Sequence, residues 1–395
     1  MEYQFSDRIA NMTGNAIRDI FKLLAKPSVI SFAGGMPAKD ALPVEEIRRI
    51  TDKVLSENGA TILQYGATEA YAPLGESAAV FLTNMAGFPC TKDEIFIISG
   101  GQQGIDLACK AFLNKGDCIL VERPTFLGAL QIMNTYEANI ISVEMDEDGI
   151  ILEALEENAK KYSPKLVYTV PTFQNPTGRT MALNRRKRML ELADKYNFFI
   201  IEDDPYCQLR YSGKPLPSIK SMDSLGRVIY LTSFSKIISP GLRTGIAAAA
   251  PLILRKMIIG KQATDVHTST LSQAIVDAFL REGILEEHIK KSNIIHKERM
   301  DKMMEMLDKT FPKDVQYTRP EGGLFIWAEL PEGIDATEML AKATARDVAY
   351  IPGTHFYAEG GHPNTIRLNF SNSSLERIER GMTILSEVIK QEIKK

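Results

Sequence analysis

The sequence predicts an α/β protein with a doubly wound, mainly parallel sheet of seven strands and a smaller α+β domain. The first reason is that short apolar runs alternate with longer amphipathic stretches between residues 94 and 250. The second is that these runs are apolar on both faces and rich in Ile and Val, which is typical of parallel strands covered by helices on both sides. The third is that this alternation stops near residue 285, so a differently built domain is expected to follow.

Seven apolar runs are predicted to form the strands of the large sheet. They occupy residues 94–99, 118–122, 139–145, 166–170, 198–203, 228–233 and 245–250. The stretches that follow the first four runs have the apolar spacing of helices. They occupy residues 104–113, 127–136, 151–162 and 183–196. Sheets of this kind bind their ligands outside the carboxyl ends of the strands, so the chemistry is expected there.

The pattern divides the chain into three regions. Residues 1–49 are expected to form an N-terminal arm and a segment of the small domain, 50–285 the large domain, and 286–395 the small C-terminal domain. The small domain should contain a long helix, a strand pair with a Gly-Gly turn, a shorter helix, a strand and a closing helix. These elements occupy residues 285–309, 315–330, 338–347, 365–371 and 374–394.

The composition excludes several classes of protein. The 395 residues are 44% hydrophobic and 25% charged with a formal net charge of −3, so neither nucleic acid nor a membrane is expected as a partner. No apolar run approaches the ~20 residues of a transmembrane helix. The first residues, MEYQFSDRIANMTG, do not have the pattern of a secretory signal, and the expected location is the cytoplasm.

Cysteine and histidine spacing gives no sign of a metal site. The four cysteines form no CxxC pair, and they are expected to be reduced thiols. The five histidines show neither HxxxH nor HExxH spacing. We therefore predict no bound metal.

A glycine-rich segment, SGGQQG at residues 99–104, lies between a predicted strand and a predicted helix. Its glycines allow close approach of the backbone, and the start of the helix offers free N–H groups to an anion such as phosphate. The alternative is an ordinary tight turn. The segment does not match GxGxxG, and the chain has no GxxxxGK[ST], which disfavours a dinucleotide or nucleoside triphosphate and hence a nicotinamide dehydrogenase.

An acidic segment, EDDPY at residues 202–206, ends the strand predicted at 198–203. Adjacent carboxylates at a strand end are costly to bury without a cationic partner. A metal pair, a carboxylate facing a protonated ring nitrogen, and a solvated acidic turn are the three interpretations that remain open.

The segment SFSK at residues 233–236 follows an apolar strand and is followed by Arg243. Most lysines are solvated surface charges, but Lys236 lies in a small loop rich in hydroxyl groups. A lysine held there can have a lowered pKa and act as an amine nucleophile and base. Ser233, Ser235 and Arg243 can donate to a phosphate. An imine-forming lysine beside an anion site is the arrangement that pyridoxal 5'-phosphate (PLP) requires.

Two further features complete the candidate site. The segment PTFQNPTG at residues 171–178 contains prolines and a glycine that favour a rigid turn, which would fix the Asn175 amide. Arg367 lies in the otherwise apolar strand predicted at 365–371, where an arginine needs an anionic partner. That partner is either a substrate carboxylate, held in bidentate fashion, or a structural carboxylate of the protein itself.

In this order and spacing, the motifs resemble the class I/II aminotransferases of PLP fold type I over nearly the whole chain. The motifs are NPTG (175–178), DDPY (203–206), SFSK (233–236) and Arg243. A finer resemblance is to the subgroup of 2-aminoadipate and kynurenine/aminoadipate aminotransferases. It depends on IRDIFKLL (17–24), SFAGGMP (31–37), LQYG (63–66), SGGQQG (99–104) and EDDPY (202–206).

The resemblance implies a role for each residue around the cofactor ring. It makes Lys236 the residue that bonds PLP as an imine, and Asp203 the partner of the ring nitrogen. It also implies that Tyr206 and Asn175 hydrogen-bond the ring hydroxyl oxygen, and that Phe126 stacks on the ring. Many relatives have Tyr where this chain has Phe126, so a phenol donor is absent at that position.

The resemblance further implies a phosphate site and a homodimer with shared active sites. The phosphate would be surrounded by Gly101, Gln102, Ser233, Ser235 and Arg243. Relatives often have a hydroxyl residue where this chain has Gly101, so that contact would come from the backbone. Tyr65 would reach the phosphate bound by the neighbouring subunit.

For the substrates, the resemblance implies transamination between an L-amino acid and a 2-oxo acid, with glutamate and 2-oxoglutarate as one pair. Arg367 would bind the α-carboxylate, helped by Asn175 and Gly35. A helix expected at residues 14–26 would adapt to the side chain: Arg18 could meet an acidic group or be only a solvated charge. Apolar residues of that helix, Ile17, Phe21 and Leu24, could instead contact aromatic or aliphatic groups.

Two other functions use the same fold. A PLP-dependent β-lyase or decarboxylase would retain the cofactor residues and differ in its products. A non-catalytic effector-binding regulator would carry a DNA-binding segment ahead of this domain, whereas this chain begins at the aminotransferase arm. The combination of Lys236, Asp203 and Arg367 favours the enzyme.

Overall fold

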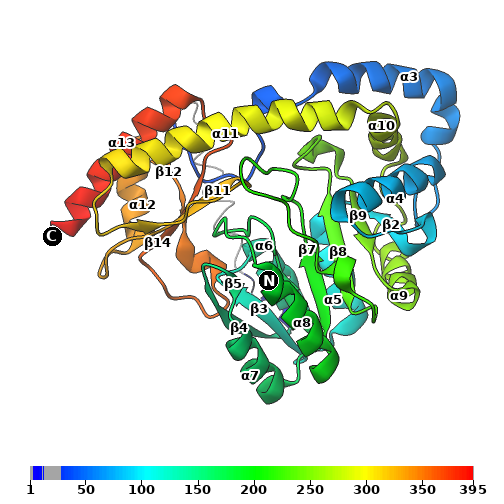
Figure 1. Ribbon diagram of the computed structural model, residues 1–395, viewed down its shortest axis with the longest axis horizontal. Coiled ribbons are helices and arrows are strands. Elements are labelled where there is room, and N and C mark those ends of the chain that lie inside the picture. Colours follow the sequence, from blue (N-terminus) through cyan, green and yellow to red (C-terminus); the bar gives the residue numbers. More distant parts are fainter. Residues whose placement is uncertain (1–2, 11, 13–27, 395) are drawn as a thin grey trace.

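The computed structural model describes residues 3–10, 12 and 28–394. Figure 1 shows a large domain built on a twisted sheet and a smaller domain, with the long helix α11 (Ile284–Thr310) running along both. The helix predicted at residues 14–26, including Arg18, lies outside the described residues.

The large sheet contains eight strands in the order β2-β9-β8-β7-β6-β3-β4-β5. The seven predicted runs correspond to β2 (Ile95–Ile98), β3 (Cys118–Arg123), β4 (Asn139–Asp146), β6 (Leu166–Thr169), β7 (Phe199–Asp203), β8 (Val228–Ser233) and β9 (Gly245–Ala248). Five of these, β4, β3, β6, β7 and β8, pair in parallel, while β9 is antiparallel to both β8 and β2. The predicted fold class is confirmed.

The eighth strand, β5 (Gly149–Ile150), pairs antiparallel with β4 and was not predicted. Two residues are too few to show a periodic apolar pattern, so the sequence carries no signal for it. The helix α5 (Gly101–Phe112) also begins three residues before the predicted 104. Its first turn therefore includes the glycine-rich segment, whose residues have low helix propensity.

Helices cover both faces of the large sheet, as the apolar character of its strands requires. They are α4 (Ala72–Ala86), α5, α6 (Leu127–Thr135), α7 (Leu152–Tyr162), α8 (Leu183–Tyr196), α9 (Pro251–Gln262) and α10 (Thr270–Arg281), while α3 (Val44–Ile62) packs against α10. Because the central strands are parallel, their carboxyl ends meet at one edge, and Asp203 and Ser233 are the last residues of β7 and β8.

The small domain has its own sheet and its own core. The sheet has the order β10-β11-β14-β13, formed by β10 (Gln316–Tyr317), β11 (Phe325–Glu329), β14 (Thr365–Asn369) and β13 (Ile351–Pro352). It is packed by α11, α12 (Ala336–Ala345) and α13 (Leu375–Ile393). The segment that precedes the large domain in the sequence belongs to the small domain. Its strand β1 (Ile30–Ser31) pairs in parallel with β12 (Val348–Ala349), and Ile30 and Phe32 lie in the core of the small domain.

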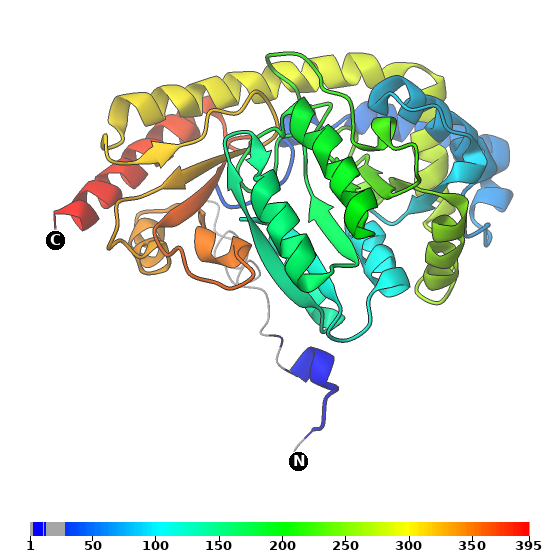
Figure 2. The same ribbon diagram turned by 60° about the horizontal axis from the view of Figure 1, so that its bottom comes forward.

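Figure 2 shows the short helix α1 (Asp7–Ala10) projecting from the body of the molecule. Its residues are exposed, and Tyr3, Phe5 and Ile9 present large apolar side chains to solvent. Among the described residues, no helix has the length and apolar character needed to cross a membrane.

Candidate active site

A cavity of about 260 Å³ lies at the carboxyl ends of the central strands, between the two domains. Twelve of the predicted site residues line it. They are Gly35, Gly101, Gln102, Phe126, Asn175, Asp203, Tyr206, Ser233, Ser235, Lys236, Arg243 and Arg367. Residues that are as far apart in sequence as Gly35 and Arg367 therefore meet in one place.

Lys236 reaches this cavity from the loop after β8. Its amine donates to the carbonyl oxygen of Gly35 at 2.6 Å, and among the described residues no carboxylate lies within ion-pair distance of it. Burial and the charges of Arg367 and Arg243 together lower the pKa of Lys236 to about 8, while Asp203 acts in the opposite direction. The neutral fraction of this amine near neutral pH is therefore much larger than that of an ordinary lysine, as a nucleophile or base requires.

Asp203 ends β7 with its carboxylate buried at the floor of the cavity. Tyr168 donates to its Oδ2 at 2.8 Å. Burial raises the pKa of Asp203 to about 7, and the Tyr168 hydrogen bond and the charge of Lys236 act in the opposite direction. A cationic partner in the cavity would return this pKa towards its ordinary range. The arrangement therefore fits a protonated ring nitrogen.

The other two carboxylates of the acidic segment have partners elsewhere. Glu202 accepts the backbone N–H groups of Ile219 and Lys220, each at 2.7 Å, and Asp204 accepts from the Tyr230 hydroxyl at 3.0 Å. All three carboxylates of the segment are buried, so the solvated turn is excluded. Because Glu202 and Asp204 are held by separate groups, only Asp203 lines the cavity.

The candidate anion site combines the start of α5 with the loop after β8. Ser233 Oγ donates to Ser235 Oγ at 2.8 Å, and Arg243 donates to Ser235 Oγ at 3.4 Å and to the Ser99 carbonyl at 3.0 Å. Gly100 has a φ of +88°, and a side chain there would overlap the Arg243 guanidinium. The first N–H groups of α5 have no partner within the helix, so they are available to an anion.

Arg367 forms the opposite wall. Its guanidinium is buried, and it donates to Asn175 Oδ1 at 2.8 Å and to the Ala33 carbonyl at 2.7 Å. It also lies over the rings of Phe325 and Phe356, at 4.3 and 4.9 Å from their centroids. Burial lowers its pKa to about 10. Its Nε has no hydrogen-bond partner, and it forms no ion pair with a described carboxylate, so the structural ion pair is not found within this part of the chain.

The turn that carries Asn175 is held in place by a hydrogen bond between two buried residues, Glu122 and Gln174, neither of which was predicted as a site residue. Glu122 accepts from Gln174 Nε2 at 3.0 Å and from Thr169 Oγ1 at 2.5 Å. The Gln174 amide oxygen accepts in turn from the Thr177 backbone and hydroxyl. Asn175 Nδ2 then lies 3.5 Å from the Tyr206 hydroxyl. Glu122 is the next-to-last residue of β3, and this position near the carboxyl end of a strand could have indicated a role at the site.

Two contacts with the cavity-lining side chains were also not predicted. Tyr168 pairs with Ile201 in the β6–β7 register, which places its side chain on the same face as Asp203. Gly128 leaves room for Phe126, because a side chain there would overlap the Phe126 ring. The strand register could have indicated Tyr168, but nothing in the sequence indicates the role of Gly128.

Tyr65 lies away from the cavity of its own chain. It is 82% exposed, and its ring stands edge-on to His267 with 6.0 Å between centroids. Leu63, also highly exposed, precedes it in the same loop. The structure therefore gives Tyr65 no contact with the candidate site of its own chain.

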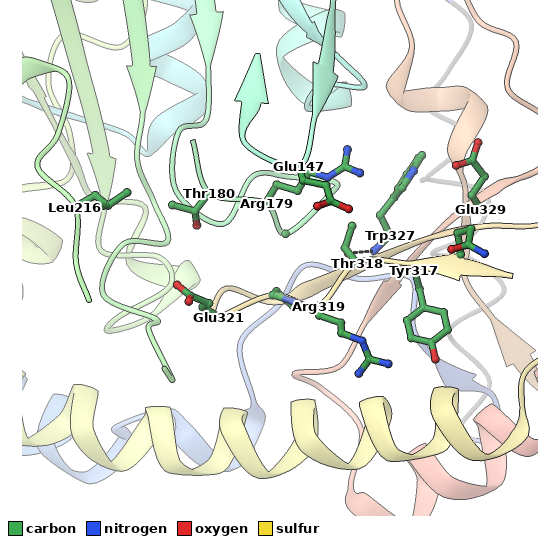
Figure 3. A pocket seen from close by; sticks show the side chains of 13 residues that line it. Glu147, Arg179, Thr180, Leu216, Tyr317, Thr318, Arg319, Glu321, Trp327 and Glu329 are labelled. Atoms are coloured by element: carbon green, nitrogen blue, oxygen red, sulfur yellow. Dashed lines mark hydrogen bonds between the residues drawn. The ribbon is translucent and has the colours of Figure 1, made fainter. Parts of the chain in front are cut away.

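A larger cavity, of about 680 Å³, lies beside the turn at residues 178–180 and the β10–β11 strand pair. Figure 3 shows Arg179, Glu147, Glu321 and Glu329 around it, with the Thr318–Trp327 hydrogen bond on its wall. None of the predicted site residues lines it. In the part of the chain that the structure describes, no lysine and no unpaired buried side-chain group lines it, so the smaller cavity is the candidate active site.

The groups of the smaller cavity fit PLP: a lysine amine with a lowered pKa, a buried carboxylate, hydroxyl and guanidinium donors for phosphate, and a buried arginine with a free Nε. With the fold, they define a PLP enzyme of fold type I. Residues 27–385 match the family described as aminotransferase class I and II, and the chain belongs to this family.

Individual relatives agree with this assignment. The chain is 45% identical to aromatic-amino-acid aminotransferase 1 of Thermococcus litoralis, over 100% of this chain and 96% of that one. The structure of Pyrococcus horikoshii kynurenine aminotransferase, in complex with PMP, KYN and KYA, matches with a TM-score of 0.95 and 44% identity over 99% of this chain and 98% of that one. LysN, the alpha-aminoadipate aminotransferase of Thermus thermophilus, complexed with N-(5'-phosphopyridoxyl)-L-leucine, matches with a TM-score of 0.93 and 36% identity over the same shares.

These matches confirm the predicted family and its resemblance to the aminoadipate and kynurenine subgroup. The protein is a PLP-dependent aminotransferase that acts on amino acids and 2-oxo acids.

Proposed function

We propose that the enzyme transfers the amino group between glutamate/2-oxoglutarate and a broad set of second substrates, with aromatic amino acids foremost and 2-aminoadipate and aliphatic amino acids also accepted. The observation that carries this proposal is that the part of the cavity wall beside Arg367 is apolar. Ala33, Leu127 and Phe325 line it, and Arg367 is the cation among them. An apolar wall beside one carboxylate receptor suits substrates that share an α-carboxylate and differ in an apolar side chain. The names of the relatives, which include aromatic and kynurenine aminotransferases, support the same choice.

The chemical roles are those that the family resemblance implies, given to the residues that line the cavity together. When bound, PLP supplies an aldehyde carbon and a ring that accepts electrons from the substrate Cα. The Lys236 amine, which is partly neutral because of its lowered pKa, would hold the cofactor through that carbon at rest. Once the substrate amine has displaced it, the same amine would take the proton from the substrate Cα and deliver it to the cofactor carbon. The Asp203 carboxylate holds a proton on the ring nitrogen.

The remaining residues bind and orient. Arg367 binds the substrate α-carboxylate through its free Nε and a terminal nitrogen, with Asn175 beside it and the Gly35 backbone opposite. Tyr206 and Asn175 hold the ring hydroxyl oxygen, and Phe126 covers the ring face. The phosphate is held by Gly101, Gln102, Ser233, Ser235 and Arg243. Arg18 remains a proposed contact for acidic side chains.

We also propose that the enzyme is a homodimer in which Tyr65 reaches the phosphate bound by the partner. The supporting observation is the exposure of apolar side chains: Leu63, Tyr65 and Val266, together with Tyr3 and Phe5 of the projecting N-terminal segment. A second copy of the chain would cover them. A cytoplasmic location is proposed as well, because all four cysteines are free thiols.

The test is an absorbance-monitored half-reaction with phenylalanine, kynurenine, glutamate, 2-aminoadipate, leucine and aspartate. We expect glutamate and the aromatic amino acids to convert the cofactor to its amine form and to release the matching 2-oxo acids. With cysteine added to the panel, release of ammonia, pyruvate and sulfide would identify a β-lyase, and release of carbon dioxide from any of the amino acids would identify a decarboxylase. Failure of glutamate to react would overturn the proposed glutamate/2-oxoglutarate pair. Failure of all the aromatic amino acids would overturn the proposal that they are the preferred second substrates.

A further inference from the structure

A second buried lysine, Lys261, lies in the last turn of α9, directly behind the glycine-rich loop. Its side chain is fully buried. The amine donates to both oxygens of Asp265, at 2.9 and 3.0 Å, and to Gln103 Oε1 at 2.7 Å. All three of its protons therefore have an acceptor within reach.

This ion pair is connected to both ends of the segment 99–103. Gln103 Oε1, which accepts from Lys261, also accepts the backbone N–H of Ser99 at 2.8 Å. Asp265 Oδ2 accepts from Ser99 Oγ at 2.8 Å and from Gln103 Nε2 at 2.7 Å. The side chains of Lys261 and Asp265 thus fix the two residues that flank Gly100, Gly101 and Gln102.

The other side of the same segment faces the active-site cavity. Gly101 and Gln102 line that cavity, and the Ser99 carbonyl accepts from Arg243 at 3.0 Å. The contact that orients Arg243 is therefore made by a residue whose own N–H and hydroxyl are held by Gln103 and Asp265. Any displacement of Ser99 would move the backbone N–H groups and the guanidinium together.

We propose that Lys261 and Asp265 are positioning residues that hold the anion-binding segment in place and thereby set the affinity of the enzyme for the phosphate group of its cofactor. This proposal rests on the assignment of Gly101, Gln102 and Arg243 to the phosphate. The physical reason is preorganisation: donors that are already fixed lose less freedom when an anion binds. The ion pair, in which Lys261 is buried and Asp265 is partly exposed, is also weak as a source of stability, so a positioning role accounts for its presence better than stability does.

The test compares the binding of PLP and of pyridoxal, which lacks the phosphate, to the apoenzyme by absorbance titration. For Lys261→Met and Asp265→Asn we expect PLP binding to weaken about tenfold, the loss of one charge-assisted hydrogen bond. Pyridoxal binding should not change. Lys256→Met is the matched control, because Lys256 is an exposed residue of the same helix. Unchanged PLP affinity, or an equal loss for PLP and pyridoxal, would overturn the proposal.

Thermal unfolding separates positioning from a purely structural role. A structural role would lower the Tm of the apoenzyme and of the PLP-bound enzyme equally, whereas the proposal predicts a smaller rise in Tm on adding PLP. If Lys261→Met does not fold, Ser99→Ala removes a donor to Asp265 without burying a charge and should weaken PLP binding by a smaller factor, again sparing pyridoxal. Arg243→Met tests the underlying assignment: if it leaves PLP affinity unchanged, the phosphate site itself is wrong. If it weakens PLP binding while the Lys261 and Ser99 variants do not, only the positioning role fails.

Discussion

Two lysines of the large domain, Lys236 in the loop after β8 and Lys261 in the last turn of α9, have surroundings that give them opposite properties. The Lys236 amine has a backbone carbonyl as its acceptor and two arginines as charged neighbours. The Lys261 amine has a carboxylate, an amide oxygen and full burial. Burial lowers both pKa values, but Arg367 and Arg243 deepen the effect at Lys236, whereas Asp265 opposes it at Lys261. The partners, and not burial alone, distinguish a candidate nucleophile at Lys236 from an ion-paired amine at Lys261.

The largest expected effect comes from removing the reactive amine. Lys236→Ala should lower kcat by at least about 10⁴-fold, because both the nucleophile and the base are lost. Lys261→Met should retain measurable turnover when PLP is supplied in excess. Steady-state assays on both variants test the comparison. Repeated turnover by Lys236→Ala would show that Lys236 is neither the nucleophile nor the base.

The second effect concerns the carboxylate opposite the amine. Asp203→Asn should lower kcat by about 10²–10³-fold, because an amide cannot hold a proton on the ring nitrogen. Asp204→Asn is the matched control, since the neighbouring carboxylate faces Tyr230 and not the cavity. Equal losses in the two variants, measured on folded protein, would contradict the assignment of Asp203.

The third effect is on substrate binding. Arg367→Ala should lower kcat/KM for every amino acid by about 100-fold, because a buried bidentate contact to the α-carboxylate is lost. A loss restricted to acidic substrates would instead show that Arg367 binds the carboxylate of the substrate side chain. Arg319→Ala, at an exposed arginine of the larger cavity in Figure 3, is the control for removing a positive charge.

The residues at strand ends were predictable from the sequence, whereas their supports were not. Asp203, Lys236 and Asn175 lie at or shortly after the ends of apolar runs in motifs of unusual composition, so their types and positions alone indicate chemistry. Tyr168 and Lys261 look like an ordinary strand residue and an ordinary helix charge. Their roles arise from contacts across the sheet and between α9 and the segment 99–103, which exist only in the folded chain.

The reactivity of Lys236 should depend on pH. Its amine is neutral above its pKa, so the rate at which the apoenzyme bonds PLP should rise with pH, with a midpoint near 8. Arg367→Met should move this midpoint upward, because a neighbouring positive charge that lowers the pKa is removed. Stopped-flow absorbance at a series of pH values measures both midpoints, and identical midpoints would show that Arg367 does not act on the amine.

The smallest expected effect is at the hydroxyl that supports Asp203. Tyr168→Phe removes a hydrogen bond that lowers the pKa of Asp203, so that pKa should rise. We expect kcat to fall about threefold to tenfold, the range of one hydrogen bond, with a larger loss at acidic pH where Asp203 becomes protonated. A pH profile of kcat identical in shape to that of the unmodified enzyme would contradict this role.

The most direct test of the account is to identify which lysine bonds the cofactor. Reduction of the PLP-bound enzyme with borohydride, followed by digestion and mass spectrometry, fixes the cofactor permanently to its amine. The account predicts a phosphopyridoxyl group on the peptide containing Lys236 and none on the peptide containing Lys261. A label on Lys261, or a label spread over exposed lysines, would contradict the assignment of the active site.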